Sequence, residues 1–308
     1  MKVSAVVITN RDDDVVAHAL RSLAAQAHRP LELVLFGNGA ALEAPPEVAA
    51  AGVDVRVGAS PTDLGVAGGR NAAAALATGD ALLFLDDDAI LRPGALDAAV
   101  AVLARTPDVG AVAFRVVDPR TRRTALWLYP LDVATWEGRR FDAPTVVGCG
   151  GLVRRDVFAR LGGFWEGYHR EVEELDLCWR MMSAGWRIRY EPDAVVEHPE
   201  RVSRRLYRYA VPANVVLPYR LLPPGLAARQ AAVKVPLFAA RAVRYGEVGD
   251  FAGGLRLLPA MLRRARRERA PLDARTVAYL RGLHAQEGWR GRVQWALRPP
   301  PPPELHAG

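Results

Sequence analysis

The chain has 308 residues, of which 50% are hydrophobic and 24% are charged, and its formal net charge is +7. These proportions are ordinary for a globular protein with one large domain, or one domain plus an extension. The two cysteines, Cys149 and Cys178, exclude a disulfide framework, show no metal-ligand spacing and favour a reducing cytoplasm. No apolar stretch reaches the roughly 18 residues that a membrane span needs, and we expect no signal peptide.

Apolar strands alternate with helices along the first 85 residues. Short connections separate them, and Pro30 and Gly79 mark two helix ends. This alternation predicts an α/β fold with a Rossmann-like, mostly parallel sheet flanked by helices on both faces. In such a sheet, ligands bind beyond the carboxyl ends of the strands. The predicted strands cover residues 3–8, 31–36, 53–57 and 81–85, and the predicted helices cover 14–27 and 65–79.

The alternation becomes less regular after residue 92, and residues 118–145 read as loop and irregular strand. Beyond residue 200 the strand patterns end, and arginine-rich helical segments interrupted by prolines follow. We therefore expect an α/β domain over 1–200, a basic helical extension over 201–297 and a flexible proline-rich tail over 298–308. The other predicted elements are helices at 94–106 and 171–186, strands at 110–117 and 187–198, and a strand turning into a helix at 150–164.

Three aspartates, Asp86, Asp87 and Asp88, follow directly on the buried strand 81–85. Adjacent carboxylates repel one another unless a positive charge lies among them, and a divalent cation is the usual partner. At the end of a strand they would project from the rim of the sheet into a cleft, where Asp-x-Asp suits a metal–diphosphate site. A solvent-exposed turn is the alternative interpretation.

A second acidic cluster, Glu173, Glu174 and Asp176, lies within one turn of the predicted helix 171–186. Glu173 and Asp176 share a helix face, whereas Glu174 points about 100° away. Apolar neighbours make this helix partly buried, so a carboxylate on it is a candidate general base with a raised pKa; surface ion pairs are the alternative. His198, after the strand-like run 187–198, is either an ordinary histidine or a metal ligand facing the same cleft.

These segments, in this order, resemble the family 2 glycosyltransferases of the GT-A fold. The resemblance covers roughly residues 2–200, and the bacterial rhamnosyltransferase-like branch is the most similar. It implies a nucleotide-diphosphate-sugar donor, a hydroxyl acceptor, a divalent cation (Mn²⁺ or Mg²⁺) and inversion of the anomeric configuration. The segments that carry the resemblance are VSAVVITNRDD, DLGVAGGRNAAAALATGDALLFLDDDAIL, GGLVRRDVFARLGGF and EELDLCWRMMSAGWRIRYEPDAVVEH.

The resemblance also implies roles for individual residues. Glu174 takes the place of the catalytic base. Asp88 and His198 take the place of metal ligands, and Asp86 serves either the metal or the ribose. Trp179 either belongs to the core or borders the acceptor pocket. The residues implied for the nucleotide are Thr9, Asn10, Arg11, Arg70 and Asp87, and those implied for the donor and acceptor pocket are Gly150, Gly151, Glu173, Asp176 and Trp179.

One position departs from the family pattern, which usually has an aspartate at the end of the second strand to hold the base. Gly37 stands there, in LVLFGNGA, and Asn38 or Asp63 are candidates to replace the missing acceptor. The departure keeps open a non-catalytic nucleotide-sugar-binding relative. A sugar-phosphate nucleotidyltransferase is a third interpretation, although it would want a lysine-bearing phosphate loop, and the chain has only Lys2 and Lys234.

Positive charge gathers in the last third of the chain, in RVSRRLYRY (201–209) and RRARRER (263–269). No nucleic-acid-reading module accompanies these arginines, so we expect no nucleic-acid partner. Interleaved tyrosine, leucine and valine suit helices that lie against a membrane surface, where lipid-linked acceptors reside. A helical cap or a dimer contact is the alternative. We expect a cytoplasmic protein, either free or peripheral on the inner face of the plasma membrane.

Overall fold

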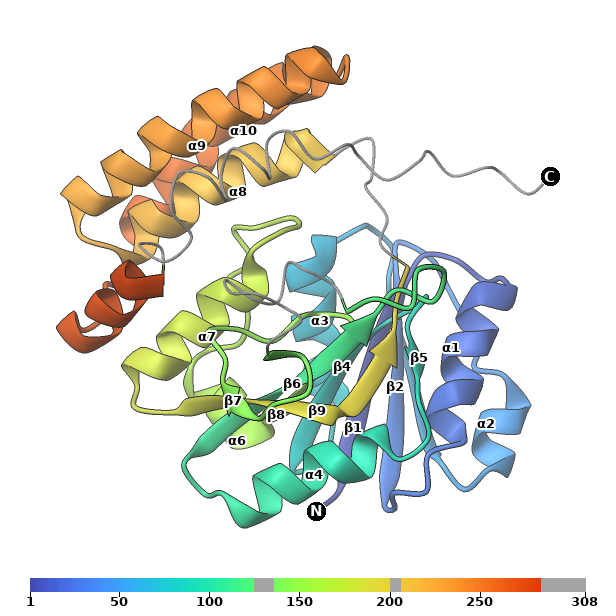
Figure 1. Cartoon of the computed structure of the whole chain (residues 1–308). Coiled ribbons are helices and arrows are strands. Elements are labelled where there is room, and N and C mark those ends of the chain that lie inside the picture. Colours follow the sequence, from blue (N-terminus) through green and yellow to red (C-terminus); the bar gives the residue numbers. More distant parts are fainter. Residues whose placement is uncertain (125–135, 200–205, 284–308) are drawn as a thin grey trace.

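A nine-stranded sheet forms the centre of the first two thirds of the chain in the computed structural model, which describes residues 1–124, 136–199 and 206–283 (Figure 1). Its strands follow the order β3-β2-β1-β4-β8-β6-β9-β5, and β7 pairs with β9. The strands are β1 (Val3–Thr9), β2 (Leu31–Asn38), β3 (Asp54–Ser60), β4 (Ala81–Asp86), β5 (Ile90–Leu91), β6 (Val109–Val117), β7 (Phe141–Asp142), β8 (Gly151–Arg154) and β9 (Arg187–Glu197).

The strand directions bring many carboxyl ends to one edge of the sheet. β3, β2, β1 and β4 pair in parallel, and β6 pairs in parallel with β9. β8 runs antiparallel between β4 and β6, so these two strands share a direction. β5 and β7 pair antiparallel with β9. This mixed, mostly parallel sheet confirms the predicted α/β fold, and its common edge is where a ligand site is expected.

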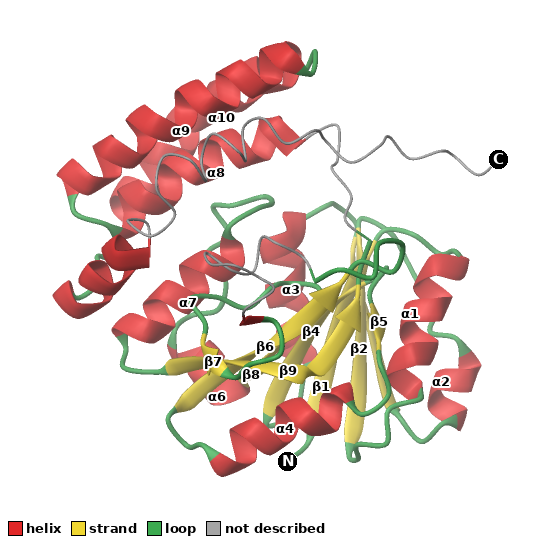
Figure 2. Ribbon diagram, in the orientation of Figure 1, coloured by secondary structure: helices red, strands yellow, loops and turns green. Residues whose placement is uncertain are grey.

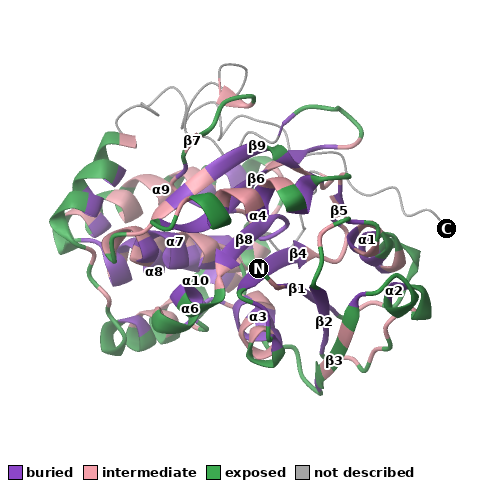
Figure 3. Cartoon of the chain, turned by 90° about the horizontal axis from the view of Figure 1, so that it is seen from below, coloured by how far each residue is buried: buried purple, intermediate pink, exposed green. Residues whose placement is uncertain are grey.

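Helices cover both faces of the sheet (Figures 2 and 3). α3 and α6 lie on one face, and α1 and α4 lie on the other. Asp13 caps α1 by accepting hydrogen bonds from the backbone N–H groups of Val15 and Val16. Every residue of β2 is buried, including Glu32 and Asn38, because the strand is covered on both sides. The helices are α1 (Asp14–Ala24), α2 (Pro46–Ala50), α3 (Gly65–Leu76), α4 (Ala95–Arg105), α6 (Arg155–Arg160) and α7 (Glu173–Ser183).

Three long helices, α8 (Leu206–Leu221), α9 (Pro224–Arg244) and α10 (Val248–Arg267), form a layer over the α7 side of the α/β unit (Figure 1). Residues 274–283 are helical as well. A second hydrophobic cluster joins this layer to α7 and to the loop before it, and its members include Trp165, Tyr168, Trp179, Val216, Leu217 and Leu280. The extension is therefore a helical cap that shares a core with the α/β unit.

Within the part of the chain that is described, no helix is long and apolar enough to cross a bilayer. Residues 201–205 of the first arginine-rich run, residues 284–297 of the predicted extension and the whole proline-rich tail lie outside the described residues. Most of the helices and strands predicted individually lie close to their observed positions, whereas α2 and β5 were not predicted. The predicted strand 187–198 is the single strand β9, and the predicted helix 171–186 begins only at Glu173.

Candidate active site

The carboxylates at the end of β4 have different partners. Asp86 is the last residue of the strand, and Asp87 and Asp88 form the turn after it. Arg11, just after β1, donates to Asp87 through Nη2 (2.7 Å to Oδ1) and Nε (3.2 Å to Oδ2). The hydroxyl of Thr9 also donates to Asp87. The pKa of Arg11 is raised by this ion pair against the opposing effect of burial. Asp87 is thus held against the end of β1.

The other two aspartates face His198, which follows β9. Its Nε2 lies 3.2 Å from Oδ1 of Asp88 and 3.6 Å from Oδ2 of Asp86. The backbone N–H of His198 donates to the carbonyl of Val117 at the end of β6 (3.0 Å), which fixes the residue at the sheet edge. The structure therefore brings together Asp86, Asp88 and His198, the three side chains that the sequence predicted as metal ligands.

Arg70 on α3 joins the two acidic clusters. Its Nη2 donates to Oδ1 of Asp86 (2.7 Å), and its Nη1 donates to Oε1 of Glu174 (2.8 Å) and to Oε1 of Glu173 (3.2 Å). The guanidinium is buried, and its centre lies 5.9 Å from the ring centroid of Phe164. The resemblance implied a nucleotide contact for Arg70, whereas in this structure its donors bind carboxylates on β4 and α7. The strand-end acids and the helix acids therefore border one site.

Gly148, which the sequence analysis did not single out, leaves the space that this cluster fills. A Cβ at position 148 would lie 2.2 Å from Nη2 of Arg70 and 2.2 Å from Oε1 of Glu174. Both distances are far below van der Waals contact, so any side chain there would displace the ion pair. The sequence offered only a weak signal, the glycine-rich run Gly148-Cys149-Gly150-Gly151.

The start of α7 is fixed by an unusual backbone and by a contact with α3. Glu171 and Val172 adopt positive φ angles of 74° and 60°, which is rare for residues with a Cβ and especially for a β-branched one. Gly65 at the start of α3 approaches the carbonyl of His169 so closely that a Cβ would lie 2.4 Å from it. The backbone N–H of Val66 donates to the same carbonyl (2.6 Å). The first turn of α3, the helix that carries Arg70, therefore contacts the loop that leads into α7.

Burial changes the titration of several groups here. Burial, reinforced by Glu174, raises the pKa of Glu173 well above its ordinary value despite the opposing Arg70. Burial and then Glu174 raise the pKa of Glu171 to about 7. The pKa of the Cys149 thiol is raised mainly by burial and next by Asp86. The raised carboxyl pKa predicted for this helix is thus found at Glu173.

Asp176 does not join Glu173, although the helix-face argument placed the two together. Its Oδ1 accepts from Nε of Arg180 (2.6 Å), and its Oδ2 accepts from Tyr168 (3.2 Å) and from Arg220 on α8. Glu173 is instead grouped with Glu174, because Nη1 of Arg70 donates to both glutamates. Asp176, fully buried, instead ties α7 to the helical cap.

Three other residues placed in the donor and acceptor pocket are packing positions. Trp179 is 5% exposed and belongs to the hydrophobic cluster shared with the cap, as the core alternative expected. Gly150 is buried, and a Cβ there would lie 2.7 Å from Cγ1 of Val196. A Cβ at Gly151 would lie 2.9 Å from Cβ of Val146. Close packing thus leaves no room for a side chain at either glycine, against β6 and β9 at Gly150 and against the loop before β8 at Gly151.

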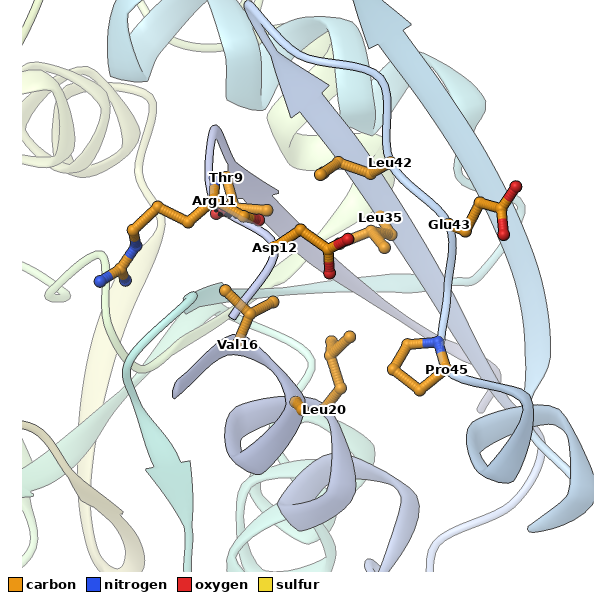
Figure 4. Close-up of a pocket in the computed structure, with 10 residues that line it drawn as sticks. Thr9, Arg11, Asp12, Val16, Leu20, Leu35, Leu42, Glu43 and Pro45 are labelled. Carbon is orange, nitrogen blue, oxygen red and sulfur yellow. Dashed lines mark hydrogen bonds between the residues drawn. The ribbon is translucent and has the colours of Figure 1, made fainter. Parts of the chain in front are cut away.

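A small pocket lies between β1, α1 and the loop after β2 (Figure 4). Its apolar lining includes Leu20, Leu35 and Leu42, whereas the guanidinium of Arg11 points away from it. Thr9 and Asp12 also line this pocket, and Asn10 between them is exposed. Three consecutive residues predicted for the nucleotide, Thr9 to Arg11, thus lie beside or near an apolar recess.

The loop after β2 explains why Gly37 stands where the family has an aspartate. The carbonyl oxygen of Ala40 lies 1.9 Å from the position that a Cβ at residue 37 would take. Asn38 is buried: its Nδ2 donates to Asp63 (3.0 Å) and its Oδ1 accepts from the N–H of Leu64 (2.9 Å). Two residues were candidates to replace the missing hydrogen-bond acceptor. The side chain of Asn38 is buried and hydrogen-bonded within the protein, whereas Asp63 is exposed.

The donor set around His198 fits a divalent cation. Oxygen atoms of Asp86 and Asp88 and a nitrogen of His198 converge there; carboxylates suit Mg²⁺ and Mn²⁺, and imidazole is a common ligand of transition-metal ions. One ligand atom each of Asp86, Cys149 and His198 lie within 4.8 Å of one another. Cys149 was not predicted as a ligand, because cysteine spacing along the chain does not report neighbours in space.

Comparison with known proteins gives consistent matches. The model of the family described as "Glycosyltransferase like family 2" matches residues 2–209. The pre-mycofactocin glycosyltransferase of Mycobacterium tuberculosis (strain ATCC 25618 / H37Rv) is 34% identical over 210 residues, which cover 65% of this chain and 43% of that protein. The glucosyl-dolichyl phosphate glucuronosyltransferase of Haloferax volcanii is 27% identical over 216 residues, which cover 64% of this chain and 69% of that protein. The chain thus spans less than half the length of its mycobacterial relative.

Solved structures share the fold at low sequence identity. The mannosyltransferase PcManGT from Pyrobaculum calidifontis, in complex with GDP-Man and Mn²⁺, has a TM-score of 0.57 at 19% identity, covering 96% of this chain and 82% of that one. TarS 1–349 from S. aureus, in complex with UDP-GlcNAc, has a TM-score of 0.59 at 15% identity, covering 95% and 90%. At such identities the likeness shows the fold alone.

Proposed function

Because this chain belongs to glycosyltransferase-like family 2 and has the GT-A fold, we propose that it transfers a sugar from a nucleotide-diphosphate-sugar donor to a hydroxyl acceptor. The observation that carries the proposal is the bridge through Arg70. One guanidinium contacts the strand-end acid Asp86 and the helix acid Glu174, so a cation-binding group and a general base border one site. The bound donors named for the two structural neighbours support a nucleotide-sugar substrate.

In this proposal Glu174 is the base. Its side chain is 19% exposed, so it can reach an acceptor at the surface, while Arg70 holds Oε1 at 2.8 Å and orients the carboxylate. Glu174 accepts the proton of the acceptor hydroxyl as the oxygen attacks the anomeric carbon and the nucleoside diphosphate leaves. One such displacement inverts the anomeric configuration. Glu173, buried behind it and with a raised pKa, supports the pair rather than meeting the acceptor.

Asp86, Asp88 and His198 would hold a divalent cation, as the Mn²⁺ named for PcManGT supports. When bound, such a cation stabilises the negative charge of the leaving diphosphate. Asp87, fixed by Arg11 and Thr9, would receive the ribose, and the base would lie near Thr9 and the exposed Asn10. Asp63 is the candidate for the base contact that Gly37 cannot make.

Replacing Asp88 by asparagine is expected to weaken metal-dependent donor binding by at least about tenfold, because a ligand charge beside His198 is lost. Calorimetric titration of UDP-sugars and GDP-sugars with Mn²⁺ measures it. Asp54→Asn is the matched control, since Asp54 begins β3 at the opposite edge of the sheet. Equal donor affinity in both variants would contradict the proposed site, and donor binding by the wild type without any transfer would favour the non-catalytic relative.

We also assign a lipid-linked acceptor at a membrane surface to this site. The Haloferax relative is named for a dolichyl phosphate substrate. Large apolar side chains are exposed on the cap next to arginines: Val243 is 70% exposed, and Leu255 and Leu257 flank the exposed Arg256. Leucine and arginine on one helix suit the interface of an anionic bilayer, where lipid acceptors are found.

The wild-type protein is therefore expected to sediment with phosphatidylglycerol vesicles at low salt and to dissociate as salt is added. Each basic residue near an anionic surface contributes roughly 1 kcal/mol, so Arg256→Glu with Arg263→Glu should weaken binding by more than about tenfold. Zwitterionic vesicles are the control. Vesicle binding that depends on neither salt concentration nor lipid charge would contradict the membrane proposal. The sugar-transfer proposal would be unaffected by that result.

A further inference from the structure

We propose that Cys149 is a sulfur ligand of the cation site and that this site therefore selects a transition-metal ion over Mg²⁺. The inference rests on the proposed function only for the location of the cation. The neighbours of Cys149 along the chain contain no other ligand residue within a metal-binding spacing.

The geometry places Cys149 among the predicted ligands. Its Sγ, an oxygen of Asp86 and a nitrogen of His198 lie within 4.8 Å of one another, a separation that one ion can span. Asp86 presents Oδ2 toward His198, at 3.6 Å, while its Oδ1 is held by Arg70. The salt bridge to Arg70 thus leaves one carboxylate oxygen directed at the cluster. Asp88 adds a second carboxylate, with Oδ1 3.2 Å from Nε2 of His198.

The local fold keeps the sulfur in this position. Cys149 is 1% exposed and lies between Gly148, which borders the Arg70–Glu174 pair, and Gly150, which packs against Val196 and Phe114. The backbone N–H of Gly150 donates to the carbonyl of Val147 (3.0 Å), closing a tight turn around the cysteine. Neither glycine position has room for a Cβ, so the turn cannot shift without disturbing the site.

The ligand types decide which ion fits. Two carboxylates alone would suit Mg²⁺, which prefers oxygen and keeps much of its water. An imidazole nitrogen and a thiolate sulfur added to them favour borderline ions such as Co²⁺ and Zn²⁺. We therefore expect the affinity for Co²⁺ to exceed that for Mg²⁺ by at least about tenfold.

The other cysteine supplies a matched control. Cys178 on α7 is also fully buried, but its Sγ accepts from the backbone N–H of Val146 (3.4 Å), and it is not among the side chains that cluster around His198. Both thiols are buried and neither forms a disulfide. A buried cysteine that serves only packing should therefore behave like Cys178.

The test titrates Co²⁺ into the reduced full-length protein and follows the near-ultraviolet charge-transfer band of a cobalt–thiolate bond. The wild type and Cys178→Ser should both develop the band. Cys149→Ser should lose the band and bind Co²⁺ at least about tenfold more weakly, because the loss of even a residue that only supports a metal ligand lowers metal affinity by that factor. X-ray absorption at the cobalt edge of the wild type reports a sulfur ligand even where Cys149→Ser fails to fold.

The outcomes separate this inference from the proposed function. A cobalt-loaded wild type with no thiolate band and no sulfur scatterer, or a Cys149→Ser protein that keeps both band and affinity, overturns the role of Cys149 and leaves sugar transfer intact. Mg²⁺ competing with Co²⁺ on equal terms overturns the selectivity. A wild type that binds nucleotide sugar but no cation overturns the inference and the metal dependence together.

Discussion

Replacing Glu174 by glutamine is expected to lower the rate of sugar transfer by about 10²- to 10⁴-fold, while nucleotide-sugar affinity changes little. Glutamine keeps the size of the side chain and an oxygen that can accept from Arg70, so the 2.8 Å contact and the fit beside Gly148 survive. What is lost is the ability to take a proton from the acceptor. Product formation with a competent donor and acceptor measures the rate, and calorimetry measures donor affinity.

Glu173, the neighbouring glutamate, provides a matched control for this prediction. Glu173→Gln is the same substitution one residue earlier, on a side chain that contacts the same guanidinium at 3.2 Å. Glu173 is buried, its raised pKa favours the neutral acid, and its Oε2 has no hydrogen-bond partner among the described residues. Glu173→Gln should therefore reduce the rate of sugar transfer less than tenfold. Equal losses in the two variants would point to a shared structural role, and full activity of Glu174→Gln would remove it as the base.

The acids of this site were predictable because each cluster is local in sequence. Asp86 to Asp88 follow an apolar strand, and the parallel sheet places strand ends at one edge, where His198 also arrives after β9. Glu173 and Glu174 stand out on a partly buried helix. The periodicity of strands and helices predicts where these acids lie on their elements. The resemblance to a family then predicted that the two clusters belong to one site.

The residues that connect these clusters were harder to predict, because their roles depend on contacts distant in sequence. Arg70 lies 104 positions from Glu174, and nothing in the alanine-rich segment around it shows that its guanidinium faces inward. Gly148 and Cys149 are informative only once α3, α7 and β9 are placed around them. The positive φ angles of Glu171 and Val172 contradict local preference, which is why the helix predicted from residue 171 begins only at Glu173.

Asp176 shows how a pattern suited to chemistry can serve stability. It belongs to the acidic motif that the sequence marks for the active site, yet its oxygens are taken by Arg180, Arg220 and Tyr168. The guanidinium of Arg220 also lies over the ring of Trp165, with 4.9 Å between its carbon and the ring centroid. This charge network joins α7, which carries the proposed base, to α8 of the cap. The cap therefore supports the helix that the chemistry depends on.

Asp176→Asn is accordingly expected to lower the free energy of unfolding by about 3–5 kcal/mol, the usual cost of removing one partner from a buried ion pair. The amide cannot balance the charges of Arg180 and Arg220, which remain buried, and its NH₂ would face a guanidinium. The shift of the urea midpoint and of the melting temperature measures the effect. Faster proteolysis of the cap should accompany it, because the lost contact joins the cap to α7.

Asp156→Asn is the matched control for this prediction, since Asp156 pairs with Arg160 at the same i, i+4 spacing on α6, and both side chains are more than half exposed. Water already solvates those charges, so the loss should stay under about 1 kcal/mol. The large difference expected between two identical substitutions follows from the burial of Asp176 and from its additional partners, Arg220 and Tyr168. Similar destabilisation in both variants, or an Asp176→Asn protein as stable as the wild type with its cap equally resistant to protease, would show that the buried network does not hold the cap to α7.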